Sequence, residues 1–301
     1  MLLVTGITGH SGRYFLQELI NNKYEGVIRC IIRETSDTSI MDNSGLRLEK
    51  VVGELTDQEF VDKVMVGVDE IIHIYNIHHS PMIIQAAIKN NIKRVILVHT
   101  TGIYSKFKNA SQEYKEIEKT IIEVAKDGNC KTSITILRPT MIYGDLCDHN
   151  MSKFIKMVDK LLIIPVIDKG NGLLQPVNAR DLGKAYYTVL NLPIKNVELK
   201  AYDLSGDKSI KIIDVLKLIS RELNKKAIFV NIPMVLGVFA ARIMKALTFG
   251  KFDVIEKVQR MGENRIYSHE DATNDFGFNP MSFEDGIKIE VVQYKTKQIK
   301  V

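Results

Sequence analysis

The chain opens with a short apolar run, three evenly spaced glycines and then a helical pattern. Residues 2–4 are all apolar, and apolar residues recur at the spacing of one helix face over 15–20. Between the two stretches lie Gly6, Gly9 and Gly12. This order predicts a buried strand, a tight turn and an amphipathic helix.

The alternation of short apolar runs with helical stretches continues over roughly the first 140 residues, as parallel sheets with crossover helices require. Parallel strands need long connections, which helices provide. The pattern therefore predicts an α/β fold with a doubly wound parallel sheet. After the first strand, the predicted strands cover residues 26–32, 46–52, 68–76, 95–99 and 133–137.

Beyond residue 145 the alternation loosens. Residues 201–206 are typical of a strand that returns to the sheet, and residues 208–223 have the pattern of an amphipathic helix. We therefore predict a nucleotide-binding domain over 1–144, with 174–205 returning to it. The remaining segments are predicted to form a smaller mixed α/β substrate-binding region, and they cover 145–173 and 206–301.

Composition is ordinary for a soluble globular protein, and the mildly basic charge is compatible with an anionic small-molecule cofactor or substrate. The chain has 301 residues and a net charge of +5, and its basic residues are scattered, which does not favour a nucleic-acid partner. Cys30, Cys130 and Cys147 lack a Cys-x-x-Cys spacing, so we expect neither a disulfide framework nor a metal site. We predict a cytoplasmic location, without a signal peptide.

One long segment near the C-terminal end is largely apolar. Residues 232–249 are mostly apolar, but Pro233 opens the segment, and Arg242 and Lys245 interrupt it. The charges argue against a transmembrane helix and favour a buried or surface-docked one. Peripheral attachment to a membrane is the less favoured alternative.

The glycine turn has the chemistry of a dinucleotide-binding site. Gly6 permits the tight turn, Gly9 lets the backbone approach a pyrophosphate, and Gly12 lets helix and strand pack closely. The helix that follows offers free N–H groups and a positive dipole end to the anion. Further candidate cofactor-binding residues in this turn and the first helical residues are Thr8, His10, Ser11 and Arg13.

The residue after the second strand indicates which dinucleotide binds. An acidic residue there would bond the ribose 2′-hydroxyl of NAD, whereas an arginine suits the 2′-phosphate of NADP. The chain has Arg33, with Thr35 and Ser36 nearby, so NADP is predicted and NAD stays an alternative. The competing interpretation of Arg33 is a solvated arginine at a strand end.

The spacing Thr-Gly-x-x-Gly-x-x-Gly over residues 5–12 resembles the short-chain dehydrogenase/reductase superfamily, in its extended or atypical branches. Further similarity lies in Gly53-Glu54-Leu55-Thr56-Asp57 and in Arg138-Pro139 followed by a Tyr-Gly pair. The resemblance implies that Glu54 and Leu55 border the adenine and that Pro139 approaches the nicotinamide. Tyr75 and Asn76 stand where the superfamily usually has two small residues beside the cofactor.

The C-terminal third resembles nucleotide-sugar epimerases and dehydratases, through residues 260–264 and 272–287. The resemblance implies that Arg260 reaches a substrate diphosphate. Residues 175–185 resemble the superfamily segment that leads a helix back to the nucleotide-binding domain, and Asn178 is a candidate substrate contact. A homodimer is common among such proteins and is one expectation for this chain.

The resemblance also implies a catalytic tyrosine, a lysine four residues later and a Ser or Thr after the fifth strand. Thr100 occupies the Ser/Thr position, with Thr101 as the alternative in a shifted register. Tyr114 is the candidate tyrosine, but Glu118 follows four residues later and Lys119 five. Five residues correspond to a rotation of about 140° around a helix. Either the helix begins after Tyr114 and the loop compensates, or the site has lost its usual acid.

Two functions follow from these observations. The first is an NADP-preferring oxidoreductase or isomerase of the epimerase/dehydratase type. It would act by hydride transfer on a nucleotide-sugar-like or other carbonyl or hydroxyl substrate. The second is a non-catalytic NADP(H)-binding sensor or assembly subunit, which the displaced tyrosine and lysine would allow.

Overall fold

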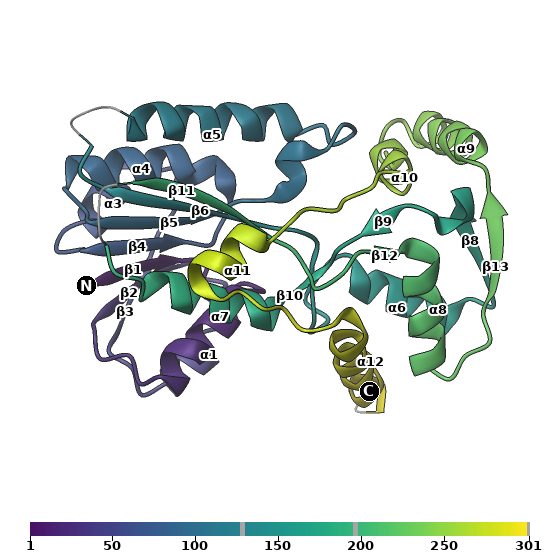
Figure 1. Cartoon of the computed structure of the whole chain (residues 1–301), viewed down its shortest axis with the longest axis horizontal. Helices are drawn as coiled ribbons and strands as arrows, with labels where there is room; N and C mark the ends of the chain where they lie inside the picture. The colour runs from purple at the N-terminus through teal and green to yellow at the C-terminus, as the bar shows by residue number, and fades with distance from the viewer. Residues whose placement is uncertain (127–129, 195–197, 300–301) are drawn as a thin grey trace.

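The computed structural model describes residues 1–126, 130–194 and 198–299. Figure 1 shows a large sheet covered by helices and, at the other end of the long axis, a smaller group of helices and short strands. Among the described residues, no helix is long and apolar enough to cross a membrane.

Seven strands form the main sheet, in the order β11-β6-β5-β4-β1-β2-β3, and all neighbouring pairs are parallel. The chain leaves β1 toward β2 on one side and later toward β4 on the other. This reversal is that of a Rossmann sheet, so the predicted fold class is confirmed. The strands are β1 (Leu2–Thr5), β2 (Ile28–Ile32), β3 (Leu48–Val52), β4 (Glu70–His73), β5 (Arg94–Val98), β6 (Ser133–Pro139) and β11 (Leu199–Leu204).

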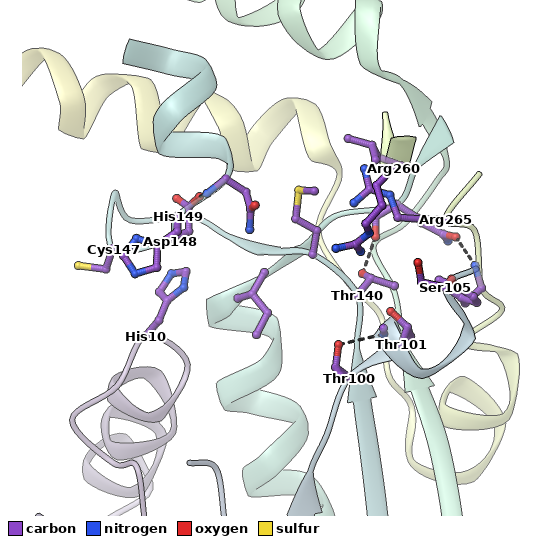
Figure 2. A pocket seen from close by; sticks show the side chains of 17 residues that line it. His10, Thr100, Thr101, Ser105, Thr140, Cys147, Asp148, His149, Arg260 and Arg265 are labelled. Atoms are coloured by element: carbon purple, nitrogen blue, oxygen red, sulfur yellow. Dashed lines mark hydrogen bonds between the residues drawn. The ribbon is translucent and has the colours of Figure 1, made fainter. Parts of the chain in front are cut away.

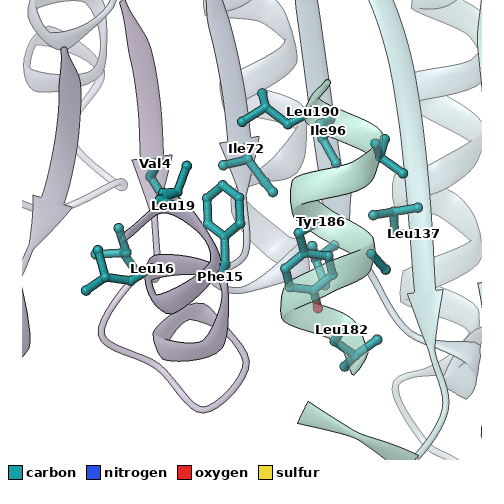
Figure 3. Close-up of a cluster of buried hydrophobic side chains, with 14 of the residues drawn as sticks. Val4, Phe15, Leu16, Leu19, Ile72, Ile96, Leu137, Leu182, Tyr186 and Leu190 are labelled. Atoms are coloured by element: carbon teal, nitrogen blue, oxygen red, sulfur yellow. The ribbon is translucent and has the colours of Figure 1, made fainter. Parts of the chain in front are cut away.

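Helices cover both faces of the sheet. One buried cluster joins the sheet to α1 (Gly12–Asn21), α7 (Ala179–Leu190) and α11 (Glu270–Phe276), and Figure 3 shows Phe15 and Tyr186 within it. A second cluster on the other face includes α3 (Gln58–Val64), α4 (Ser80–Lys89) and α5 (Ser111–Ala125). Because both faces are covered, the central strands β1, β4 and β5 are almost entirely buried, whereas the edge strands β3 and β11 are partly exposed and carry charged residues.

Short elements connect the strands and helices. The side chain of Asp57 accepts the N–H groups of Glu59 and Phe60 and caps α3. Asn178 caps α7 in the same way through the N–H of Arg180. The remaining short helical segments are α2 (Ser39–Asp42), η1 (Ile77–His79), η2 (Thr101–Tyr104) and η3 (Asp168–Gly170).

A third buried cluster holds the C-terminal region together and packs α6, α8 and α12 around short two-stranded ladders. In these ladders β7 pairs with β10, β9 with β12, and β8 with β13. The elements are β7 (Ile142–Tyr143), α6 (Met151–Lys160), β8 (Ile163–Ile167), β9 (Leu173–Leu174), β10 (Val177–Asn178), β12 (Ile210–Lys211), α8 (Ile212–Glu222), β13 (Ile228–Ile232), α9 (Met234–Leu247), α10 (Ile255–Arg260) and α12 (Phe283–Ile299).

The strands predicted for the main sheet are all present, and their ends differ from the prediction by up to three residues. Within the segment 174–205, α7 packs against α1 and β11 pairs with β6. The fold thus brings the carboxyl ends of β1, β2, β4 and β5 to one edge, where α/β proteins of this topology bind ligands.

Candidate functional site

The turn between β1 and α1 is tightly bent. Gly6 has φ +75°, in the left-handed region that favours glycine, and its carbonyl accepts the N–H of Gly9 at 3.0 Å. A Cβ on Gly12 would collide with the Gly6 carbonyl oxygen and with the backbone of Ile7. The glycines therefore allow α1 to begin directly above the carboxyl end of β1, with its first N–H groups at the ligand-binding edge.

A cavity of about 170 Å³ lies beside this turn, at the carboxyl ends of β1, β2, β3 and β4. Many of the predicted cofactor residues meet there, although they come from four separate segments of the chain. The lining consists of Thr5, Gly6, Thr8, Gly9, Ile31, Ile32, Arg33, Ser36, Gly53, Glu54, Leu55 and Tyr75.

Arg33 is held at the edge of this cavity without an acidic partner among the described residues. Its guanidinium carbon lies 6.0 Å from the centre of the Tyr75 ring, which stacks on His79. Its backbone N–H donates to Ser36 Oγ at 3.1 Å. An exposed guanidinium and a hydroxyl beside a cavity are suitable donors for a phosphate group.

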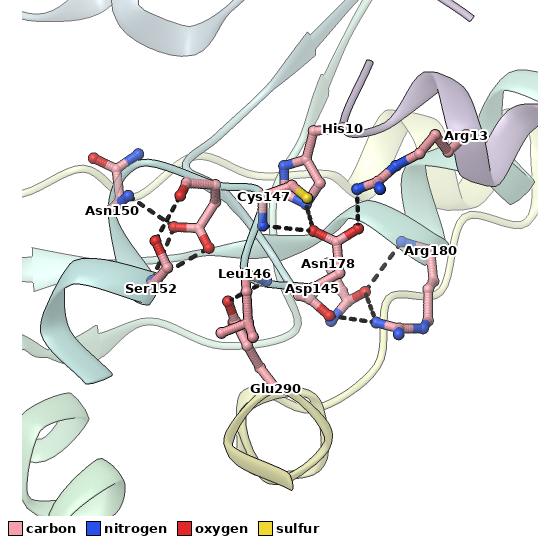
Figure 4. A network of polar contacts seen from close by, with 12 residues as sticks. His10, Arg13, Asp145, Leu146, Cys147, Asn150, Ser152, Asn178, Arg180 and Glu290 are labelled. Carbon is pink, nitrogen blue, oxygen red and sulfur yellow. Dashed lines mark hydrogen bonds and ion pairs between the residues drawn. The ribbon is translucent and has the colours of Figure 1, made fainter. Parts of the chain in front are cut away.

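Other predicted cofactor residues contact the protein itself. Asp145 binds both His10, with Nε2 2.8 Å from Oδ1, and the guanidinium of Arg13 (Figure 4). Burial by itself would raise the pKa of Asp145. The pKa is nevertheless lowered, because His10 contributes a hydrogen bond and a charge and Arg13 contributes a further charge. The Oγ of buried Ser11 accepts a hydrogen bond of 3.3 Å from the hydroxyl of Tyr186. Among the described residues that line the smaller cavity, Arg33 is therefore the cation available to a ligand phosphate.

Two more predicted cofactor residues are engaged in local structure. The side-chain oxygen of Asn76 accepts the N–H of His78 and caps η1. Pro139 ends β6, and its carbonyl accepts the hydroxyl of Thr101 at 3.3 Å. These contacts shape the carboxyl ends of β4 and β6 without adding a side-chain donor to the small cavity.

A larger cavity, of about 490 Å³, lies between the edge of the main sheet and the C-terminal region (Figure 2). His10 from the glycine turn lines it, so the turn separates the two cavities. Its other lining residues come from five segments and are Thr100, Thr101, Gly102, Ser105, Thr140, Met141, Ile142, Cys147, Asp148, His149, Asn150, Leu174, Gln175, Arg260, Arg265 and Tyr267.

Thr100 lies in this larger cavity, as the sequence-based hypothesis requires of a substrate-orienting hydroxyl. Its Oγ1 accepts the N–H of Gly102 at 3.0 Å, which leaves its proton available to another acceptor. The hydroxyl of Thr101, the alternative residue, is engaged with the Pro139 carbonyl. The geometry thus favours Thr100 over Thr101 for contact with a ligand.

The segment after α10 forms one wall of the larger cavity. Glu263 accepts the hydroxyl of Ser105 at 2.8 Å and the N–H of Lys106 at 2.8 Å. Further along, the N–H of Arg265 donates to the Leu173 carbonyl at 2.8 Å. These bonds tie the C-terminal segment to η2 and β9, and they hold two arginines against the cavity.

Arg260 and Arg265 give this wall a positive charge. Arg260 lies 3.6 Å from each of Glu256 and Glu263, whereas Arg265 has no acid within ion-pair distance among the described residues. The buried Nε atoms of both arginines find no hydrogen-bond partner in the part of the chain that the structure describes. Burial and the nearby charge of Arg260 lower the pKa of Arg265 to about 10. Two partly buried guanidiniums beside one cavity, one of them without an acidic partner among the described residues, favour an anionic ligand.

The sequence analysis did not predict Arg265 as a site residue. The signal that could have identified it was the presence of a second arginine five residues after Arg260. Asn178, the other predicted substrate contact, is buried at the start of α7 and lines neither cavity. Its Oδ1 accepts the N–H of Arg180 at 3.0 Å. Its role as a substrate contact stays a prediction.

Tyr114 and Lys119, the predicted catalytic pair, lie on different sides of α5. The Tyr114 ring packs 5.7 Å from the His78 ring, and its side chain lines neither cavity. The Lys119 side chain is 68% exposed, and its Nζ lies 3.9 Å from Glu123. The catalytic assignment of this pair stays a prediction, and Lys119 lies away from both cavities.

Glu118 explains this orientation of α5. Its carboxylate is buried and accepts Arg138 Nη2 at 2.5 Å, and it lies 3.0 Å from Nδ1 of His99. The other ring nitrogen of His99 lies 3.0 Å from the Ser80 hydroxyl. Because Glu118 and Lys119 are about 100° apart on a helix, burying one directs the other outward.

Lys108 was missed by sequence reasoning because it lies in the loop before α5. Its stem packs against Gly102, where an added Cβ would lie 3.0 Å from Lys108 Cδ. Its ammonium group lies 5.4 Å from the centre of the Tyr114 ring. Burial and the charge of Arg260 lower its pKa. This half-buried lysine therefore stands between the Thr100–Gly102 turn and Tyr114.

Two carboxyl groups lie close together where the 145–150 loop packs on α12: Asp148 in the loop and Glu290 on the helix. Glu290 on α12 is fully buried and accepts the N–H of Leu146 at 3.0 Å (Figure 4). The carboxyl of Asp148 lines the larger cavity and accepts the N–H of Asn150 at 2.7 Å. Burial and the neighbouring Asp148 raise the pKa of Glu290 to about 9, so Glu290 is protonated at neutral pH.

No group of three or more His, Cys, Asp or Glu side chains in the described part of the chain is arranged to hold a metal ion.

Comparison with known proteins agrees with this geometry. Residues 6–146 match the family model described as NAD(P)H-binding. A curated relative, sterol demethylase protein B of Methylococcus capsulatus, is 29% identical over 116 residues. That match covers 33% of this chain and 34% of the relative, so the chain matches about a third of the relative's length.

Solved structures match over the whole chain. UDP-glucuronic acid 4-epimerase from Bacillus cereus, in complex with UDP-glucuronic acid and NAD, has a TM-score of 0.76 at 15% identity, covering 98% of this chain and 99% of the epimerase. A dTDP-glucose 4,6-dehydratase double mutant from Streptomyces venezuelae has a TM-score of 0.75 at 16% identity, covering 100% of this chain and 98% of the dehydratase. Residues 6–146 therefore match an NAD(P)H-binding family model, and the chain as a whole shares the Rossmann fold of these two solved structures.

Proposed function

We propose that this chain is an NADP-preferring oxidoreductase or isomerase that acts by hydride transfer on a carbonyl or hydroxyl substrate with an anionic group, such as a nucleotide sugar. The observation that carries the proposal is the pair of cavities on either side of the glycine turn. The smaller one is lined by residues suited to an adenosine. The larger one combines the Thr100 hydroxyl with two guanidinium groups.

The residues around the smaller cavity fit a dinucleotide. The glycine turn and the first N–H groups of α1 would hold the pyrophosphate, and Leu55 and Glu54 would border the adenine. Arg33 and Ser36 would bind a ribose 2′-phosphate. Bound there, the nicotinamide cofactor would supply the hydride chemistry that no side chain can provide.

The larger cavity would hold the substrate. Arg260 and Arg265 would bind a phosphate or carboxylate, and Thr100 would orient the reacting oxygen. Burial raises the pKa of Tyr114, with Glu113 and Glu256 adding to the effect, so its phenol keeps its proton at neutral pH. A raised pKa makes this phenol a weaker acid, so proton donation by Tyr114 would need the positive charge of Lys108, whose ammonium lies 5.4 Å from the ring centre. Tyr114, which lines neither cavity, would also have to move toward the substrate.

Cofactor selectivity is tested by titrating the purified chain with NADPH and NADH and following nicotinamide fluorescence. We expect tighter binding of NADPH, and we expect Arg33→Ala to weaken NADPH binding by about tenfold or more while leaving NADH nearly unchanged. Arg47→Ala, an exposed arginine one strand away, is the control. Equal binding of both cofactors by the wild type would contradict the NADP preference.

Turnover is tested with UDP-glucose, UDP-glucuronic acid, dTDP-glucose and simple carbonyl compounds, by following nicotinamide absorbance and product formation. We expect one anionic class to react, and we expect Tyr114→Phe to lower kcat more than it raises KM. Unchanged turnover in Tyr114→Phe would remove Tyr114 as the proton donor.

The orientation of α5 favours one second candidate. Lys119 faces solvent and Tyr114 lines neither cavity, so the chain could bind NADP(H) without turnover, as a sensor or an assembly subunit. Tight NADPH binding without turnover across the full substrate panel would support this candidate. Detectable turnover would exclude it.

A further inference from the structure

The helix α9 exposes an unusual amount of apolar surface. Only Gly237 and Ala241 of its fourteen residues are buried. Leu247 is 75% exposed, and Phe249, just after the helix, is 96% exposed. The large exposed apolar side chains of this region are Val235, Leu236, Phe239, Ile243, Met244, Leu247, Phe249 and Phe252, and we refer to them as the α9 patch.

The helical residues of the α9 patch lie on one face of α9. At about 100° per residue, the patch residues of the helix fall within roughly half of its circumference. The opposite half contains Gly237, where an added Cβ would lie against Ile167 and Val258. Arg242 projects from the margin of that opposite half, and Lys245 lies near its centre, where its ammonium pairs with Asp253. The helix therefore packs on the protein with its small residues and presents its large apolar ones to solvent, the reverse of an ordinary surface helix.

Position and charge indicate what this face meets. In Figure 1, α9 lies at the end of the molecule far from the main sheet. Exposed Arg242, Lys251 and Lys257 near the patch have no acidic partner among the described residues. The neighbouring acids Asp253 and Glu256 are paired with Lys245 and Arg260. The surroundings of the patch are therefore positively charged.

We propose that the α9 patch docks on the surface of a membrane that contains anionic lipids. The patch would enter the boundary between headgroups and acyl chains, and Arg242, Lys251 and Lys257 would meet lipid phosphates. At 1.5 Å per residue, the fourteen residues of α9 extend about 21 Å, less than the roughly 30 Å of a hydrocarbon core, so the helix lies on the membrane.

The charges favour a membrane over a second copy of the chain. In a twofold dimer through the α9 patch, each copy would bring the same patch with the same unpaired cations and no additional unpaired acid among the described residues, so the interface would gather like charges. An anionic lipid surface complements those cations. Because α9 packs on α10, which ends at Arg260, the docked helix also lies next to the wall of the larger cavity.

The test is co-sedimentation of the full chain with vesicles of phosphatidylcholine alone or with added phosphatidylserine. We expect binding to the phosphatidylserine vesicles, weakened by high salt because exposed charges are screened. Phe239→Asp should reduce the bound fraction by about tenfold or more. The substitution removes a large apolar side chain that would enter the membrane, and it adds a negative charge that anionic lipids repel. Val66→Asp, at a similarly exposed apolar residue outside the patch, should bind as the wild type does.

Arg242→Glu separates the electrostatic contribution and should lower binding to phosphatidylserine vesicles more than to phosphatidylcholine vesicles. Circular dichroism and NADPH binding should be unchanged in all three variants, which shows that they are folded. The proposal is overturned if the wild type binds neither vesicle, or if Phe239→Asp and Val66→Asp bind equally. It is also overturned if vesicles do not bind and Phe239→Asp instead dissociates a dimer in analytical ultracentrifugation.

Discussion

Single atoms decide whether the glycine turn can form. A methyl group at residue 12 would meet the carbonyl oxygen of Gly6, which is also held by the N–H of Gly9. We expect Gly12→Ala to push α1 away from β1, to weaken NADPH binding by about tenfold or more and to lower stability by about 1–3 kcal/mol. Fluorescence titration and thermal unfolding measure the two effects.

The matched control is Gly67→Ala. Gly67 also has a positive φ, of +77°, but an added Cβ there meets nothing within 4 Å. We expect a loss of about 1–2 kcal/mol from backbone strain alone, with NADPH binding unchanged. If both variants bound NADPH as the wild type does, close packing at Gly12 would not be needed for the cofactor site.

We predict that Glu290 makes the free energy of unfolding depend on pH. Its pKa is about 9 in the folded chain and 4.5 in the ordinary state, so the folded state holds one more proton between these values. Its contribution to stability is therefore complete below about pH 4.5 and declines as the pH rises toward about 9. We expect Glu290→Gln, which does not titrate, to lose less stability than the wild type between pH 6 and about pH 9.

Urea unfolding at several pH values measures this difference. Glu284→Gln on the same helix is the control, because Glu284 is exposed and its ion pair with Arg221 contributes little. Parallel pH curves for the wild type and Glu290→Gln would show that Glu290 is ionised in the folded protein.

At the scale of an element, α5 is oriented by one buried carboxylate. Glu118→Ala would leave Arg138 and His99 without their shared partner, and we expect a loss of about 3 kcal/mol or more. Lys119→Ala, one residue away, should change stability by less than about 0.5 kcal/mol, because its ammonium is solvated. Thermal and urea unfolding of both variants checks the contrast.

The same pair of variants tests the catalytic role of Lys119. If NADPH binding and turnover are unchanged in Lys119→Ala, the outward orientation of this side chain persists in the complex. Loss of either activity with intact stability would mean that α5 reorients when ligands bind.

At the scale of the whole molecule, the larger cavity depends on contact between two distant parts of the chain. Glu263 binds the loop at Ser105 and Lys106 and holds the segment that carries the two cavity arginines. We expect Glu263→Ala to raise KM for an anionic substrate by roughly tenfold, because these hydrogen bonds are lost, and to leave NADPH binding unchanged.

Steady-state kinetics and NADPH titration measure the two quantities separately. Asp253→Asn, an exposed acid paired with Lys245 before α10, is the control and should change neither. A parallel loss of NADPH affinity in Glu263→Ala would show that the two cavities do not act independently.

The sequence by itself determined the main sheet, the glycine turn and the grouping of Gly6, Arg33 and Glu54 around one cavity. These features follow from local patterns: apolar runs mark buried strands, and the carboxyl ends of parallel strands meet at one edge. Tertiary structure decided the rest. Lys119 faces outward because Glu118 binds Arg138, and Arg265 enters the site because Glu263 fastens its segment. Such outcomes depend on partners far away in the sequence. The exposed face of α9 shows the same limit of sequence-based prediction, because periodicity identifies an apolar face without identifying what covers it.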